Sequence, residues 1–130
     1  MDSVVHFEMP YIEQGRAATF YKEAFGWETQ ILGPDMGDYI LVTTAKEDVK
    51  PGSPAGAING GLFPTKPDWP AQYPSVVIGV PDIGAAMRKI RDAGGQVLGD
   101  PMEVPGTGMY VSFLDTEGNR NSILQPYMEA

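Results

Sequence analysis

The fold is decided by the stretch Phe20-Tyr21-Lys22-Glu23-Ala24-Phe25-Gly26-Trp27. Its apolar side chains, with Ala17 before them, recur at helical spacing and predict a helix over 13–25. Gly26 stands where a residue in the left-handed conformation commonly ends a helix. Around this helix we predict strands over 4–9, 27–32, 38–44 and 55–63, with a turn at 33–35, a loop at 46–54 and an interruption of the last strand at Gly60-Gly61.

The second half of the chain repeats this order. Asp82 is placed to cap a helix whose apolar face includes Ile83, Met87 and Ile90, and Gly94-Gly95 ends it. Strands are predicted over 75–80, 96–98, 103–104, 109–114 and 120–125, the last two joined by a hairpin turn at 115–119. Each half therefore reads as a strand, a helix and three strands, and the two halves are offset by about 70 residues.

This repeat predicts an α+β protein of one domain over 1–130, with module one at about 1–63, a linker at 64–74 and module two at about 75–130. A single ferredoxin-like sheet with an extra hairpin is the competing fold. It would leave the second strand–helix–three-strand unit unexplained, so the repeat decides for two βαβββ modules.

Composition excludes several classes of function. The chain has no cysteine and one histidine, so it has no disulfide or thiolate site, and no single chain can supply two histidines to a metal. Its net charge of −8 disfavours nucleic acid and anionic membrane surfaces as partners. We find no membrane-spanning apolar run and no signal peptide, and we expect a cytoplasmic protein.

The aromatic stretch at 20–27, Val80-Pro81-Asp82-Ile83, Ala93-Gly94-Gly95 and Asp115-Thr116-Glu117-Gly118-Asn119 together resemble the vicinal oxygen chelate superfamily, the group of glyoxalases, bleomycin resistance proteins and extradiol dioxygenases. The resemblance covers essentially the whole chain. It implies two βαβββ modules that form a curved eight-stranded mixed sheet around a cleft, and it implies a homodimer. In its metal-dependent members, four strands each supply one ligand to a divalent ion, which acts as a Lewis acid.

This chain retains a residue able to bind a metal at one of those four ligand positions. His6, fourteen residues before Phe20, matches the first-strand ligand. The other positions fall near Asn59 to Gly61, on Ser75 and on Ser122, where no acid or histidine stands. Serine is a poor ligand for a divalent transition metal. The resemblance therefore supports the fold, and we expect no cofactor, a divalent metal being the disfavoured alternative.

The resulting candidate site consists of ligand-binding residues that the modules and the linker supply: His6, Glu8, Trp69, Tyr73, Ser75, Tyr110 and Ser122. His6 and Glu8 share one face of their strand and could work as an acid/base pair or as polar anchors; His6 could equally be a structural histidine that makes one hydrogen bond. Tyr110 could contact a ligand or belong to the core.

The linker between the modules carries four prolines together with Trp69 and Tyr73. It is a rigid crossover in one interpretation and part of a binding cleft or a dimer contact in the other.

Two classes of function follow. The first is a protein that binds a small organic molecule without the metal of the family, and the acidic chain would suit a cationic ligand such as a basic antibiotic. The second is an enzyme: a divergent metal-dependent lyase, isomerase or dioxygenase of the same superfamily, or a divergent lyase, isomerase or epimerase that uses His6 and Glu8. A structural or partner-binding role is a third alternative.

Overall fold

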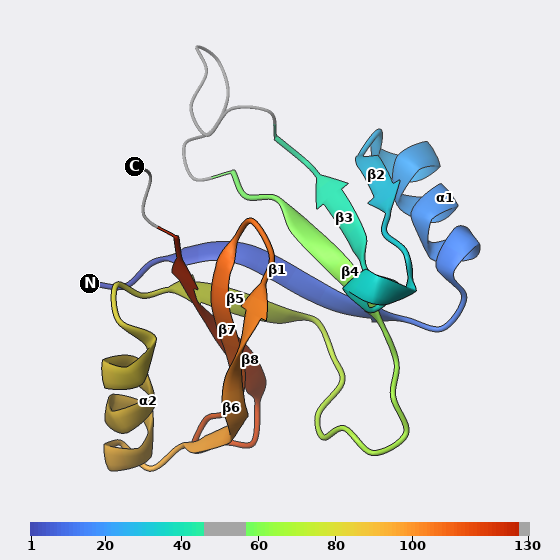
Figure 1. Cartoon of the computed structure of the whole chain (residues 1–130). Coiled ribbons are helices and arrows are strands. Elements are labelled where there is room, and N and C mark those ends of the chain that lie inside the picture. The colour runs from blue at the N-terminus through green and yellow to red at the C-terminus, as the bar shows by residue number, and fades with distance from the viewer. Residues whose placement is uncertain (46–56, 128–130) are drawn as a thin grey trace. The chain divides into compact units, whose positions relative to one another are not determined.

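The computed structural model describes residues 1–45 and 57–127 (Figure 1). Within these ranges the chain forms eight strands, two α-helices and one short 3₁₀ helix, and it divides into two compact units, residues 6–74 and residues 1–5 with the segment from Ser75 onward. In chain order the elements are β1 (Val4–Tyr11), α1 (Gln14–Phe25), β2 (Glu28–Ile31), η1 (Pro34–Met36), β3 (Ile40–Thr43), β4 (Gly60–Pro64), β5 (Ser75–Gly79), α2 (Ile83–Asp92), β6 (Gln96–Val104), β7 (Gly108–Leu114) and β8 (Arg120–Pro126).

The unit of residues 6–74 contains four strands in the order β2-β3-β4-β1. β1 and β4 run parallel, and the other neighbouring strands are antiparallel. One face of these strands packs against α1, and the buried core between them consists of Tyr11, Ala18, Ile40, Val42 and Leu62. On β1, Phe7 and Met9 also pack against this core, which leaves the alternate residues of β1 on the face away from the helix.

The aromatic stretch at 20–27 ends α1 as predicted. Gly26 adopts the left-handed conformation (φ 72°), and its N–H donates to the Lys22 carbonyl. The turn brings Trp27 back against the helix, where its ring stacks on Tyr21 with centroids 4.8 Å apart. On its other side, Trp27 contacts Phe7 of β1 at 5.6 Å, so the motif ties the helix to the first strand.

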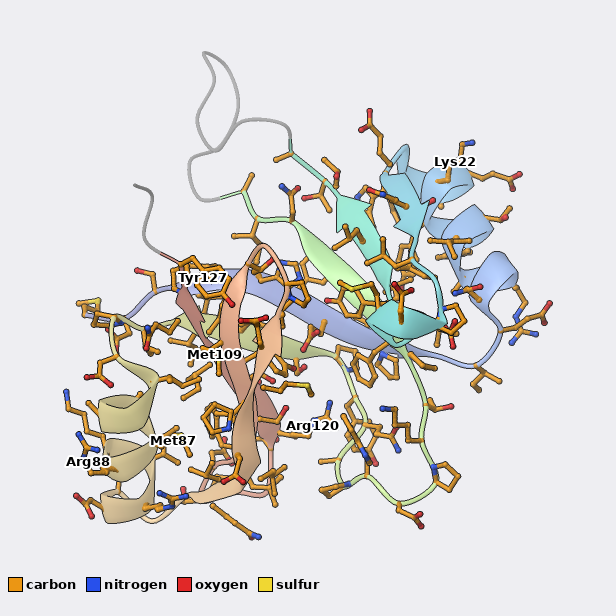
Figure 2. The ribbon with its side chains drawn as sticks, viewed as in Figure 1. Lys22, Met87, Arg88, Met109, Arg120 and Tyr127 are labelled. Atoms are coloured by element: carbon orange, nitrogen blue, oxygen red, sulfur yellow. The ribbon has the colours of Figure 1, made fainter. Side chains whose placement is uncertain are left out.

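The other unit repeats this architecture with the strand order β5-β8-β7-β6, in which β5 and β8 are parallel. Helix α2 covers one face, and Figure 2 shows Met87 pointing from it toward the strands while Arg88 points away. The buried core is formed by Val80, Ile83, Met87, Val111, Phe113 and Ile123. Asp82 caps α2, because its side chain accepts a hydrogen bond from the Ala85 N–H at 3.0 Å.

The first five residues belong to this second unit and not to the one that follows them in the chain. The Gly79 N–H of β5 donates to the Ser3 carbonyl at 2.9 Å. The strand β1 thus begins in one unit and continues in the other.

The predicted fold class, α+β with two βαβββ modules and eight strands in mixed pairing, is confirmed. Two local predictions are wrong. Gly60 and Gly61 do not interrupt the strand predicted over 55–63 but lie within β4, paired with Phe7 and Glu8. The two short strands at 96–98 and 103–104 are one strand, β6, with an irregularity between Leu98 and Met102. The predicted loop at 46–54 lies outside the described residues, as do residues 55–56 at the start of the strand predicted over 55–63.

Within residues 1–45 and 57–127, no helix has both the length and the apolar character that crossing a membrane requires.

Candidate functional site

His6 and Glu8 lie on the face of β1 that points away from α1. They alternate with Phe7 and Met9, which face the helix, so both polar side chains project to the opposite side. Glu8 retains only 6% of its accessible surface, and His6 is partly buried. A carboxylate this deeply buried requires hydrogen-bonding partners.

Tyr39, which no sequence pattern marks as a site residue, links these two residues. Its hydroxyl donates to Glu8 Oε2 at 2.8 Å and lies 3.1 Å from His6 Nε2. Tyr39 directly precedes β3, and the strand β4 lies between β3 and β1. The phenol therefore reaches across a whole strand to join the two polar residues of β1.

Gly61 makes this reach possible. It is paired with Glu8 on β1 and with Leu41 on β3, so it lies directly beneath the path of the phenol. A Cβ at Gly61 would lie 1.9 Å from the Tyr39 hydroxyl and 2.0 Å from its Cζ, which no real structure tolerates. The glycine thus opens the space that the tyrosine ring fills.

The electrostatics of the network favour a neutral imidazole. Burial lowers the pKa of His6 below its ordinary value of 6.5, and the negative charge of Glu8 raises it to a smaller extent. The site therefore combines a neutral histidine, a phenol and a carboxyl group in a chain of hydrogen bonds. Such a chain can orient a polar ligand or carry a proton.

Ser122 and Tyr110 belong to a second polar cluster, in the unit that contains β5 to β8. Their hydroxyls lie 2.6 Å apart, and the hydroxyl of Ser112 lies 3.0 Å from that of Ser122. All three residues alternate with the core residues Val111 and Ile123, so they occupy the face away from α2, and Ser122 is 1% exposed. Tyr110 is therefore not part of the core beneath α2.

Ser112 is the member of this cluster that sequence reasoning missed. The hairpin turn predicted at 115–119 already contained the signal, because a ladder that closes on that turn pairs Leu114 with Arg120 and hence Ser112 with Ser122. Arg120 lies two residues before Ser122 on β8 and is also buried, with 6% of its surface exposed. No comparable signal identified Tyr39.

Trp69 and Tyr73 lie in the segment between β4 and β5. The Lys66 ammonium lies 4.2 Å from the centroid of the Trp69 ring, a cation–π contact. The Gln72 side chain accepts from the Lys66 N–H and donates to the Lys66 carbonyl, each at 2.6 Å, which folds this segment onto itself. Tyr73 is 71% exposed, so its ring has little apolar surface to rest on within the chain.

Ser75 begins β5 and is partly buried. The structure thus joins His6 to Glu8 through Tyr39, and it joins Ser122 to Tyr110. These two clusters belong to different units of the chain.

The donors at the four ligand positions do not fit a divalent metal. His6 Nε2 faces the Tyr39 hydroxyl, and the Ser122 hydroxyl is engaged with two other hydroxyls. The Asn59 amide oxygen accepts from the N–H groups of Thr44 and Ala45, both at 2.8 Å. Neutral hydroxyls and an occupied amide are weak ligands for such an ion. Among residues 1–45 and 57–127, no three His, Cys, Asp or Glu side chains gather closely enough to hold a metal.

Comparison with known proteins agrees with this fold. Residues 3–123 match the family model of the Glyoxalase/Bleomycin resistance protein/Dioxygenase superfamily. A glyoxylase-like domain-containing protein from Didymella fabae is 29% identical over 119 residues, which are 89% of this chain and 88% of that protein.

Solved structures with the same fold are more distant in sequence. A hypothetical protein from Bacillus halodurans superposes with a TM-score of 0.70 at 12% identity and covers 99% of this chain and 97% of its own. Methylmalonyl-CoA epimerase from Streptomyces coelicolor, in complex with 2-nitronate-propionyl-CoA, gives 0.68 at 20% identity, with 96% and 97% covered. The corresponding enzyme from Mycobacterium tuberculosis gives 0.65 at 16% identity, with 96% and 88% covered.

Proposed function

We propose, from the premise that this chain belongs to the Glyoxalase/Bleomycin resistance protein/Dioxygenase superfamily, that it binds a small organic molecule and does so without a divalent metal. The observation that carries the proposal is the hydrogen-bonded chain of His6, Tyr39 and Glu8. Polar groups that are held in place and shielded from water are what a ligand site uses to fix orientation.

Donor chemistry supports the metal-free form of the proposal. Chelation of a divalent ion requires several charged or imidazole ligands directed at one point. Here the one imidazole is hydrogen-bonded to a phenol through Nε2, and two of the other ligand positions carry serine.

A second candidate function is proton transfer, as in an isomerase or epimerase. The observation that favours it is that the Tyr39 hydroxyl lies within hydrogen-bonding distance of both His6, a base, and the carboxyl group of Glu8. His6 would exchange a proton with the substrate, and Tyr39 and Glu8 would stabilise the imidazolium. A substrate with an acidic C–H next to a carbonyl would suit this chemistry.

The decisive experiment begins with chelator-stripped protein. Its thermal melt is measured with Ni²⁺, Zn²⁺, Mn²⁺ and Fe²⁺, and then against a library of small molecules that includes cationic antibiotics. We expect no stoichiometric metal effect, and we expect organic compounds that raise the melting temperature of the wild type but not of His6→Ala. The matched control is Glu23→Gln on the exposed side of α1, which should respond like the wild type.

Two outcomes would contradict the proposal. If one metal raises the melting temperature of the wild type but not of His6→Ala, metal catalysis becomes the favoured function. If organic ligands stabilise the wild type and His6→Ala equally, the ligand site does not include this network. His6→Ala itself should remain folded, because His6 lies outside both apolar cores.

We also propose that the protein is a homodimer and that the segment with Trp69 contributes either to its ligand site or to its dimer contact. Size-exclusion chromatography with light scattering, together with the ligand screen, tests both roles in Trp69→Ala. We expect weaker binding or a shift toward monomer. Unchanged affinity together with an unchanged mass would remove this segment from both.

A further inference from the structure

The Tyr39 hydroxyl has one proton, and its position in the network determines where that proton goes. The hydroxyl donates its proton to Glu8 Oε2 at 2.8 Å. Toward His6 Nε2, at 3.1 Å, the same oxygen can then act only as an acceptor. The hydrogen bond between them therefore requires the proton of the imidazole to be on Nε2.

In a neutral imidazole with its proton on Nε2, the other nitrogen, Nδ1, carries a lone pair. Within the described residues, the polar contact of the His6 ring is the one to Tyr39 through Nε2. No fully buried side-chain nitrogen or oxygen in those residues lacks a hydrogen-bond partner. Nδ1 must then retain some solvent-accessible surface.

We infer that Tyr39 is a positioning residue that fixes His6 in the Nε2–H tautomer, and that His6 Nδ1 accepts a hydrogen bond from an O–H or N–H group of the ligand. This inference rests on the proposed function and names the chemical class of its ligand. Glu8 acts behind Tyr39 by accepting the phenolic proton, as a carboxylate fixes a histidine tautomer in other sites.

The backing network matters most when the imidazole gains a proton. If the ligand transfers a proton to Nδ1, the bond from that proton to the ligand breaks, an N–H bond forms at Nδ1, and the ring becomes an imidazolium. The Nε2–H group still donates to Tyr39, and Tyr39 still donates to the Glu8 carboxylate. No other proton has to move.

The first test requires no ligand, because His6 is the only histidine of the chain and its ring gives one set of signals. In ¹⁵N-labelled protein above pH 7.5, two-bond ¹H–¹⁵N correlations distinguish a protonated ring nitrogen from one with a lone pair. We expect Nε2 to be protonated and Nδ1 to carry the lone pair. A predominant Nδ1–H tautomer would overturn the inference.

Tyr39→Phe retains the ring above Gly61 and removes the hydroxyl. We expect its His6 signals to move toward a mixture of the two tautomers, and we expect Glu8→Gln to produce a smaller change in the same direction. Tyr127→Phe is the matched control, because Tyr127 also donates to a glutamate, Glu103, in the other unit. If Tyr39→Phe is folded and leaves the tautomer unchanged, Tyr39 has only a structural role.

The second test uses pairs of aromatic fragments that differ only in a phenol or its methyl ether. We expect the phenols to shift the Nδ1 signal and the ethers to leave it unchanged. Equal shifts from both members, or no shift from any phenol, would overturn the ligand class even where the tautomer is as expected. The proposed function fails separately, when no compound of the wider library binds at all.

Discussion

Replacing Gly61 by alanine should displace Tyr39 and thereby disconnect His6 from Glu8. The added Cβ would lie 1.9 Å from the phenolic oxygen, so the ring has to leave its place. The loss includes one hydrogen bond to a buried carboxylate, worth about 1.5–3 kcal/mol, and one to an imidazole, worth about 0.5–1.5 kcal/mol. Alanine recovers about 0.5–1 kcal/mol relative to glycine in a strand. We expect the free energy of unfolding to fall by about 1–4 kcal/mol.

The assay is urea unfolding followed by tryptophan fluorescence. Both tryptophans, Trp27 and Trp69, lie in the same unit as Gly61, so the signal reports on that unit. The control for the general effect of adding a methyl group is Gly15→Ala in α1, where a Cβ would meet no atom within 4 Å. That control should stabilise the protein by up to about 1 kcal/mol.

A double-mutant cycle with Tyr39→Ala provides the stringent test. Once the phenol is absent, Gly61→Ala has nothing to displace and should change the stability by less than about 0.5 kcal/mol in the destabilising direction. If Gly61→Ala has the same cost in both backgrounds, the glycine is required for another reason and the reasoning is refuted. A cost below about 0.5 kcal/mol in the wild-type background would refute it equally, because the network would then not depend on the ring.

Three further predictions concern other parts of the chain. Ser122→Ala should lower the free energy of unfolding by about 1–3 kcal/mol in urea, because two neighbouring hydroxyls lose their buried partner; a neutral result would mean that water replaces the serine. Burial lowers the pKa of His6, so the stability that the neutral imidazole contributes is present above pH 6.5 and is lost as the pH falls from there toward the lowered pKa. Between pH 7.5 and 5.5 the free energy of unfolding should therefore fall more in the wild type than in His6→Gln, and parallel pH profiles would contradict this. Asp82→Ala should cost about 1 kcal/mol by removing the cap from α2, whereas Asp82→Asn should retain most of it; an equal loss in both thermal melts would mean that the charge and not the hydrogen bond matters.

Sequence patterns were sufficient for the features that depend on local periodicity. The aromatic stretch ending at Gly26 and the cap at Asp82 each act on residues close to them in the chain, and both are confirmed. The hairpin turn at 115–119 is likewise local and is sufficient to pair Ser112 with Ser122.

The remaining features depend on contacts that no local pattern carries. Tyr39 joins residues 31 and 33 positions away across an intervening strand, so only the three-dimensional order of the strands brings them together. Gly60-Gly61 was interpreted as an interruption because glycine weakens strands in general. Here each glycine leaves room for an aromatic ring, Phe7 on one face of β4 and Tyr39 on the other. Gly99, Asp100 and Pro101 lie between the two short strands that the sequence predicts at 96–98 and 103–104. The single strand β6 continues through them because an edge strand tolerates an irregularity and a proline that a central strand does not.

The assignment of the first five residues to the C-terminal unit has a consequence for how the chain is completed on the ribosome. These residues are synthesised before residues 6–74, yet the strand whose Gly79 N–H donates to the Ser3 carbonyl, β5, begins only at Ser75. The unit of residues 6–74 can form its internal contacts before β5 is synthesised, because it is one continuous segment of the chain. Residues 1–5 can make this contact only after residues 6–74 have been synthesised, and the contact has a long sequence separation, which slows folding. A substitution in residues 1–5 would therefore affect the unit whose contacts are completed last.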